Sequence, residues 1–172
     1  DMGAFGVGCS RIAQTIHVST AGSDETGDGS QQNPYATIQK GIDEVDYYYN
    51  ENYASEAIEW TGITVSDTIL VHDGTYEIDN LIGGYDDYSD NVTIIASLNG
   101  PNSTFLLPEE NAGGIGNTLA FYDISGFTLT GMNFFVYASF ISFKNCIIRE
   151  TAEFSASSCH LYCFVFEKTT FI

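Results

Sequence analysis

Three segments in the last third of the chain share one pattern of apolar and polar residues. Each begins apolar, polar, apolar, continues through three or four mixed residues, and ends in an apolar pair: FTLTGMNFF from Phe127, ISFKNCIIR from Ile141 and FVFEKTTFI from Phe164. A supersecondary unit that recurs about every 20 residues, built of short strands and irregular turns, is typical of a solenoid whose coils stack on one another. The pattern therefore predicts an all-β protein of the β-solenoid type.

Other short apolar runs support the same fold class. They are rich in β-branched and aromatic residues, have the length of strands, and are broken by Gly, Asn, Asp or Ser: TILVHDGTY, NVTIIASLNG, STFLLP and NTLAFYDISG. A β-sandwich of about eight short strands would also fit these runs. The repeated frame favours the solenoid over the sandwich.

One segment before these runs has helical spacing. Its apolar residues are four, three and four positions apart, which makes a single stripe along an amphipathic helix: Ile38, Ile42, Val45 and Tyr49. Thr37 is suited to the N-cap, and Pro34 keeps the preceding chain extended. We expect a short helix that fades within residues 47–52.

The first half of the chain also resembles a known family. The stretch IHVSTAGSDETGDGSQQNPYATIQKGIDEV, followed by DTILVHDGTYEI, resembles the N-terminal region of right-handed parallel β-helix proteins of the pectate-lyase-like superfamily. Later segments such as FISFKNCII are similar to the stacked repeats of polymorphic outer-membrane-type surface proteins. The resemblance implies a right-handed parallel β-helix with an N-terminal capping α-helix, in which Ile38, Ile42 and Val45 face the first coil.

A length of 172 residues suits one domain, and the same resemblance divides it into parts. Residues 1–62 would hold the N-terminal strand, the acidic loop (GSDETGDGSQQNPY, residues 22–35), the cap helix and an insertion (YYYNENYASEAIEWTG, residues 47–62), and residues 63–172 would hold the coils. The sequence stops at TTFI without a polar cap. We expect that the coils either continue in a longer chain or pair with another subunit, and end-to-end pairing would give a filament.

The charge of the chain restricts its partners. Asp and Glu number 23 against 5 Lys and Arg, which gives a formal net charge of -18. Nucleic acids and anionic membranes need clustered cations, so both are excluded, and a polyanionic substrate would need bridging Ca²⁺. No apolar run is long enough for a transmembrane helix. The acidity, with glycosylation sequons at Asn91 and Asn102, favours a secreted or surface location.

Four cysteines leave several chemistries open: Cys9, Cys146, Cys159 and Cys163. On a strand, Cys159 and Cys163 would lie about 13 Å apart, at ~3.3 Å per residue, which is too far for a disulfide. Buried thiols, or one bridge to a neighbouring strand, are favoured over a metal site.

The acidic loop invites a calcium interpretation. An EF-hand that starts at Asp24 fails, because its twelfth position is Tyr35, where a bidentate Glu is required. A looser Ca²⁺ site could use Asp24, Asp28 and backbone carbonyls. The alternative is that these carboxylates make turn hydrogen bonds, and we favour it.

Three further groups of residues suggest carbohydrate chemistry. Asp86, Asp87 and Asp90 in GGYDDYSD could bind Ca²⁺ or act as a catalytic pair on a sugar, although a solvated loop is favoured. The candidate bases for a lyase are Lys144, Arg149 and Lys168. Aromatic residues in the insertion could stack on sugars or pack against a protein: Tyr47, Tyr48, Tyr49 and Trp60. His17 and His72 are expected to face outward or to be satisfied by neighbours.

The sequence supports two functional hypotheses. The leading one is an extracellular structural or adhesive protein that binds copies of itself, other surface proteins or glycans, with no cofactor other than calcium. The alternative is a carbohydrate-active enzyme, either a polysaccharide lyase or a glycoside hydrolase, or a glycan-binding module.

Overall fold

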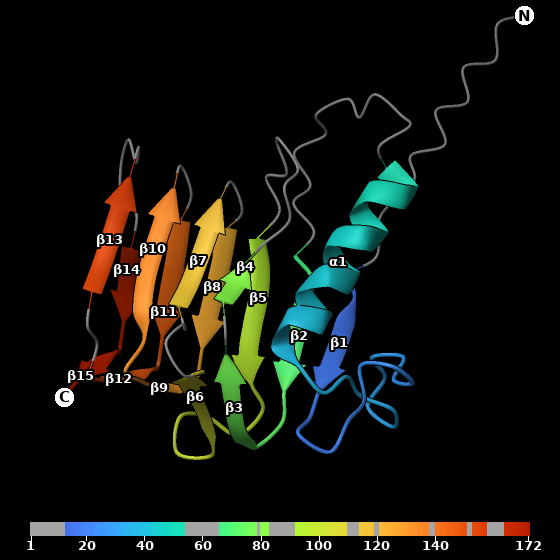
Figure 1. Cartoon of the computed structure of the whole chain (residues 1–172), viewed down its shortest axis with the longest axis horizontal. Helices are drawn as coiled ribbons and strands as arrows, with labels where there is room; N and C mark the ends of the chain where they lie inside the picture. The colour runs from blue at the N-terminus through green and yellow to red at the C-terminus, as the bar shows by residue number, and fades with distance from the viewer. Residues whose placement is uncertain are drawn as a thin grey trace, which may run out of the picture.

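The computed structural model describes nine stretches of the chain: residues 13–53, 66–78, 80–82, 92–109, 114–118, 121–137, 140–150, 153–157 and 164–172. Within them the chain forms fifteen strands and one α-helix, and the strands make three sheets in which every pairing is parallel (Figure 1). This arrangement agrees with the predicted all-β class and its single short helix.

Each sheet collects strands that are far apart in the sequence. Sheet 1 contains β1 (Thr15–Val18), β2 (Thr68–Val71), β5 (Val92–Ser97), β8 (Phe121–Ser125), β11 (Phe140–Lys144) and β14 (Phe164–Glu167). Sheet 2 contains β3 (Gly74–Ile78), β6 (Thr104–Pro108), β9 (Thr128–Thr130), β12 (Ile147–Arg149) and β15 (Thr170–Phe171). Sheet 3 contains β4 (Asn80–Ile82), β7 (Gly114–Thr118), β10 (Asn133–Tyr137) and β13 (Glu153–Ser157).

The chain visits the three sheets in a fixed rotation. From β2 onward each strand pairs with the strand three places further along, so successive strands belong to sheets 1, 2 and 3 in turn. We call each such set of three consecutive strands a three-strand repeat. Neighbouring repeats lie side by side, from β1 at one end of the molecule to β14 and β15 at the other (Figure 1).

The register places equivalent side chains in rows that form the core. Because successive side chains of a strand alternate between its faces, a constant register keeps the same positions inside. The inner row of sheet 1 is Ile16, Ile69, Ile95, Ile124, Phe143 and Phe166. The inner row of sheet 2 is Tyr76, Leu106, Leu129, Ile148 and Phe171. All members are buried except the last in each row.

The register corrects one part of the repeat predicted from the sequence. Ile141 pairs with Phe164, 23 residues further on, so the second and third sequence frames are in step. Its partner on the other side is Tyr122, 19 residues earlier, and not Phe127. The frame that starts at Phe127 begins with a strand of sheet 2, whereas the other two frames begin with strands of sheet 1. The sequence prediction was wrong here because alternating strands occur in all three sheets and look alike in sequence.

The corner between sheets 1 and 2 is the same in three successive repeats. Gly126, Asn145 and Lys168 each come directly after a strand of sheet 1 and have φ values of 78°, 50° and 50°. The N–H of Gly126 donates to Lys144 O, and that of Asn145 donates to Glu167 O, so the corners are hydrogen-bonded to one another. Asn tolerates this left-handed conformation better than most residues, whereas Lys168 adopts it at some cost.

Helix α1 (Ile38–Tyr53) packs at the β1 end of the rows (Figure 1). It contacts β1, β2 and β4, and its side chains Ile38, Ile42 and Val45 are buried. A Cβ on Gly41 would lie 3.1 Å from Ile69 Cγ2. Glycine therefore lets the helix approach the sheet closely. The helix runs slightly further than residues 47–52, where the sequence predicted its end.

Candidate functional site

The acidic loop is part of how the β1 end of the molecule is closed. Its backbone pairs with the outer edge of β1: the N–H of His17 donates to Gly29 O at 2.8 Å, and the N–H of Tyr35 donates to His17 O at 3.0 Å. The Ser19 N–H in turn donates to Tyr35 O at 2.8 Å. An edge strand whose hydrogen-bonding groups are already used cannot accept another strand. We call β1, this loop, α1 and the adjacent β2 with the turn that follows it (residues 72–73) the closed end.

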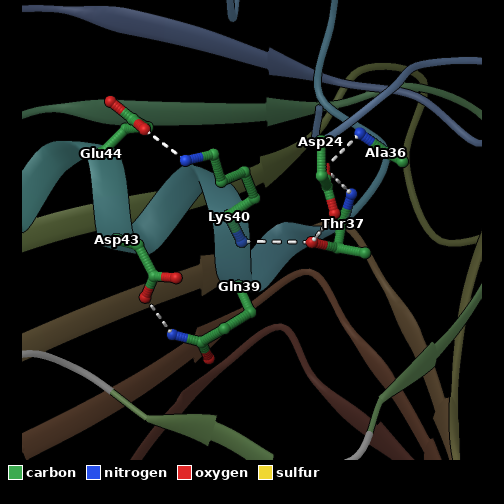
Figure 2. Close-up of polar contacts among 7 residues, drawn as sticks. All are labelled: Asp24, Ala36, Thr37, Gln39, Lys40, Asp43 and Glu44. Atoms are coloured by element: carbon green, nitrogen blue, oxygen red, sulfur yellow. Dashed lines mark hydrogen bonds and ion pairs between the residues drawn. The ribbon is translucent and has the colours of Figure 1, made fainter. Parts of the chain in front are cut away.

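Asp24 ties the loop to the start of α1. Its Oδ1 accepts the N–H groups of Ala36 and Thr37 at 2.7 and 3.0 Å, and its Oδ2 accepts the Thr37 hydroxyl at 2.7 Å (Figure 2). Thr37 Oγ1 accepts the Lys40 N–H at 3.2 Å, which is N-cap geometry. A carboxylate beside a helix N-terminus is also favoured by the helix dipole.

Asp28 makes turn hydrogen bonds within the same loop. Its Oδ1 accepts the Ser30 N–H at 2.9 Å, and hydrogen bonding from Ser30 is the main reason why the pKa of Asp28 lies below its ordinary value. The described residues contain no group of three or more His, Cys, Asp or Glu side chains that could hold a metal ion. Calcium binding by Asp24 and Asp28 stays a prediction.

The opposite end of the rows exposes apolar side chains. Phe166 and Phe171, the last members of the two inner rows, are 40% and 53% exposed, and Ile172 is 73% exposed. The Phe166 ring stacks on Phe143, with centroids 5.4 Å apart, and meets the edge of Phe171 at 5.1 Å. We call β14, β15 and these side chains the open end.

Lys144, one of the candidate lyase bases, lies in an ion pair on sheet 1. Its Nζ is 2.6 Å from Asp123 Oδ2, and the Ser142 hydroxyl donates to Asp123 Oδ1 at 2.9 Å. The hydrogen bond to Asp123 raises the pKa of Lys144. A base must be neutral to accept a proton, so this pairing works against the predicted role.

Several predicted site residues lie outside the described residues, and their roles stay predictions: Asp86, Asp87, Asp90, Asn91, Trp60, Cys9, Cys159 and Cys163. Tyr47, Tyr48 and Tyr49 belong to α1, but their side chains are also outside the described part. The carbohydrate-active hypothesis depends mainly on these residues and stays open with them.

Asn102, the second predicted glycosylation site, is exposed in the turn before β6. The hydroxyl of its sequon residue Thr104 is buried and lies 2.7 Å from Ser97 Oγ. The sequon is therefore accessible at its Asn side chain, whereas its Thr belongs to the folded interior.

Cys146 is a free, buried thiol at the corner between sheets 1 and 2. Its Sγ donates to Lys144 O at 3.3 Å and to Ile124 O at 3.7 Å. Thr169 occupies the equivalent position in the next repeat and donates to Phe143 O at 3.0 Å. Burial raises the pKa of Cys146. The matching threonine indicates a structural role, and burial makes the thiol unreactive.

Two histidines that the sequence treated separately lie together at the closed end. His17 Nδ1 and His72 Nε2 are 3.1 Å apart, and the two rings meet edge to face with centroids 5.3 Å apart. Both side chains are partly exposed. Desolvation, followed by the neighbouring His72, lowers the pKa of His17. The two histidines are 55 positions apart in sequence, and sequence patterns do not reveal their contact because it depends on the register between β1 and β2.

Comparisons with known proteins do not identify the chain: no family model, curated protein or solved structure matches it. No helix in the described part of the chain is long and apolar enough to cross a membrane.

Proposed function

We propose that the chain is a right-handed parallel β-helix that serves as an extracellular structural or adhesive protein, and that it joins a second copy of itself through the open end. The rotation of strands among three parallel sheets supports this fold, because a β-helix places one strand of each coil in each sheet. The acidic composition and the exposed Asn102 sequon support an extracellular setting.

The observation that carries the proposal is the exposure of two core rows where they stop. Phe143 is fully buried beneath Phe166, whereas Phe166 is 40% exposed, and Phe171 beside it is more exposed still. Contiguous apolar surface beside the last strands of two sheets is a ready site for further strands. A second copy would bury these rings and pair the outer edge of β14.

The closed end determines how two copies would meet. Because α1 and the acidic loop already cover β1, a head-to-tail contact would require them to leave. Two open ends can meet directly, and the same surface on both subunits gives a two-fold symmetric dimer. If the coils continue past Ile172, the same surface would receive the next coil of the longer chain. Between the two modes of self-association, we favour a closed dimer over the filament that the sequence suggested.

Charge would oppose this contact at low salt. Each copy carries a formal charge of -18, so the two copies repel one another until counterions screen them. Dimerisation should strengthen as the salt concentration rises from about 0.02 to about 0.5 M, where the screening length falls to a few ångströms.

Light scattering coupled to size-exclusion chromatography tests the proposal. The unmodified chain should elute as a dimer at about 0.5 M salt, and Phe171→Lys should shift it to the monomer mass. Leu98→Lys is the matched control, because Leu98 is 47% exposed but belongs to neither core row. A monomer at all concentrations, or equal behaviour of the two variants, would overturn the proposal. Circular dichroism would establish that both variants are folded.

A further inference from the structure

The histidine pair at the closed end has no part in the proposed assembly, and its geometry suggests a separate role. We propose that His17 Nδ1 and His72 Nε2 together bind a late first-row divalent metal ion of the zinc and copper type. The two nitrogens come from different elements of the closed end and lie 3.1 Å apart. The remaining coordination positions of the ion would be filled by water.

The distance between the nitrogens is close to what chelation requires. Zinc binds imidazole nitrogen at about 2.0–2.1 Å, and a tetrahedral angle at the metal then separates two nitrogens by about 3.3–3.4 Å. The observed separation of 3.1 Å is slightly shorter than this. In the hydrogen bond one of the two nitrogens carries the proton, so that imidazole must move its proton to its other ring nitrogen, and both rings must turn about their side-chain bonds, before both lone pairs point at one ion.

Hydrogen bonds on both sides hold the backbone of each histidine. The His17 N–H and C=O are bound by Gly29 and Tyr35 of the acidic loop. The His72 N–H donates to Val18 O at 2.8 Å, and its C=O accepts the Tyr76 hydroxyl at 2.9 Å. These hydrogen bonds hold the backbone of both histidines in place. Ion binding would therefore restrict little beyond the rotation of the two rings. Such preorganisation favours affinity.

The surroundings allow an ion to enter and favour a cation. Both side chains are partly exposed, and His17 is flanked in sequence by the buried residues Ile16 and Val18, which places its ring on the outer side of the strand. The charge of -18 raises the local concentration of cations. Imidazole ligands suit copper, zinc and nickel, whereas calcium and magnesium require oxygen ligands. The histidine pair should therefore prefer copper, zinc and nickel to calcium and magnesium. The acidic surface attracts all of these cations and does not select among them.

Two histidines without a third protein ligand in the described residues define a site of limited affinity. We expect the order of divalent ions to be copper above nickel and zinc, and these above manganese. The proposal does not depend on the oligomeric state, because the pair lies at the closed end.

Copper and zinc binding by the tag-free, metal-stripped protein tests the proposal. Electron paramagnetic resonance of the Cu²⁺ complex should show splitting by two nitrogens, and calorimetry should show one Zn²⁺ per chain. His17→Gln and His72→Gln should each weaken Zn²⁺ binding by about tenfold or more and remove the two-nitrogen pattern. His160→Gln is the matched control, since it removes a histidine from outside the pair and should leave both readouts unchanged.

Two results would overturn the proposal. One is the absence of Zn²⁺ and Cu²⁺ binding by the unmodified chain, which would leave the pair as a hydrogen bond between imidazoles. The other is binding that persists in His17→Gln and His72→Gln, which would assign the ions to other groups of the chain, such as surface carboxylates or the cysteines. Glutamine can keep a hydrogen bond at either position, and thermal unfolding without metal would show whether each variant remains folded.

Discussion

The two ends of the strand rows finish their sheets in opposite ways. At the closed end, the first strand of sheet 1 is covered twice: its edge by backbone groups of the acidic loop, and its inner face by α1. At the open end, the rows of sheets 1 and 2 stop at exposed phenylalanines. Both ends use the same kind of strand, so the difference lies in the loop and helix that accompany β1.

The largest expected effect compares two phenylalanines of one row. Phe143→Ala should cost about 3–5 kcal/mol of unfolding free energy, because it leaves a cavity in a fully buried position. Phe166→Ala should cost about 1–2 kcal/mol at low salt, where repulsion between copies favours the monomer and part of that ring is in water. Urea unfolding followed by circular dichroism measures both. Equal losses would mean that the open end is covered in solution.

A smaller effect is expected where the loop meets α1. Asp24→Ala removes an acceptor of two backbone N–H groups and one hydroxyl, and should cost about 1–3 kcal/mol. Asp24→Asn keeps an acceptor oxygen and should cost less. Hydrogen exchange of the Ala36 and Thr37 amides would show where the loss occurs. If the two variants lost the same stability, the carboxylate charge would be the main contribution.

Two ion pairs test whether charge matters more at the closed end than in the middle of the molecule. Lys40 pairs with Glu44 on α1, and Lys144 pairs with Asp123 on sheet 1 (Figure 2 shows the first). All four side chains are partly exposed, so Lys40→Met and Lys144→Met should each cost less than about 1 kcal/mol. Thermal unfolding at low and high salt measures both. A clearly larger loss for Lys40 would show that the cap depends on charge as well as burial.

The smallest effect is expected from Asp28 and depends on pH. Its pKa is lowered in the folded chain, so it binds protons more weakly there than in the unfolded chain, where its pKa is near 3.8. Its contribution to stability is therefore complete above that value and is lost as the pH falls through the folded pKa. Unfolding midpoints should differ between wild type and Asp28→Asn above about pH 4, and converge in stronger acid. A constant difference from mildly to strongly acidic solution would contradict the linkage.

The sequence was a good guide wherever side chains carry the structure. The spacing of Ile38, Ile42 and Val45 predicted the buried face of α1, and the alternating frames at Ile141 and Phe164 predicted core rows in step. Patterns of apolar and polar residues predict these buried faces because buried positions are filled mainly by apolar residues. They could not assign strands to sheets, since the frame at Phe127 has the same alternation in a different sheet.

The features missed by sequence reasoning depend on backbone groups and on long-range register. The acidic loop covers β1 through Gly29 and Tyr35 backbone atoms, which leave no mark in composition. The contact between His17 and His72 exists because β1 and β2 pair in one particular register, and a shift by one residue would turn His17 to the inner face. In sequence, Asp24 is compatible with both a calcium ligand and a hydrogen-bonded turn residue, because the N–H groups of Ala36 and Thr37 that it binds are of a kind that every residue except proline carries.

The corner formed by Gly126, Asn145 and Lys168 has a consequence for how such a chain can change in length. Two residues join sheet 1 to sheet 2 in each of these three repeats, although the repeats themselves differ by several residues between Tyr122, Ile141 and Phe164. All the variation is therefore carried by the connections that involve sheet 3. New peptide segments could be inserted there without disturbing the stacking, while the corner keeps sheets 1 and 2 aligned along the molecule.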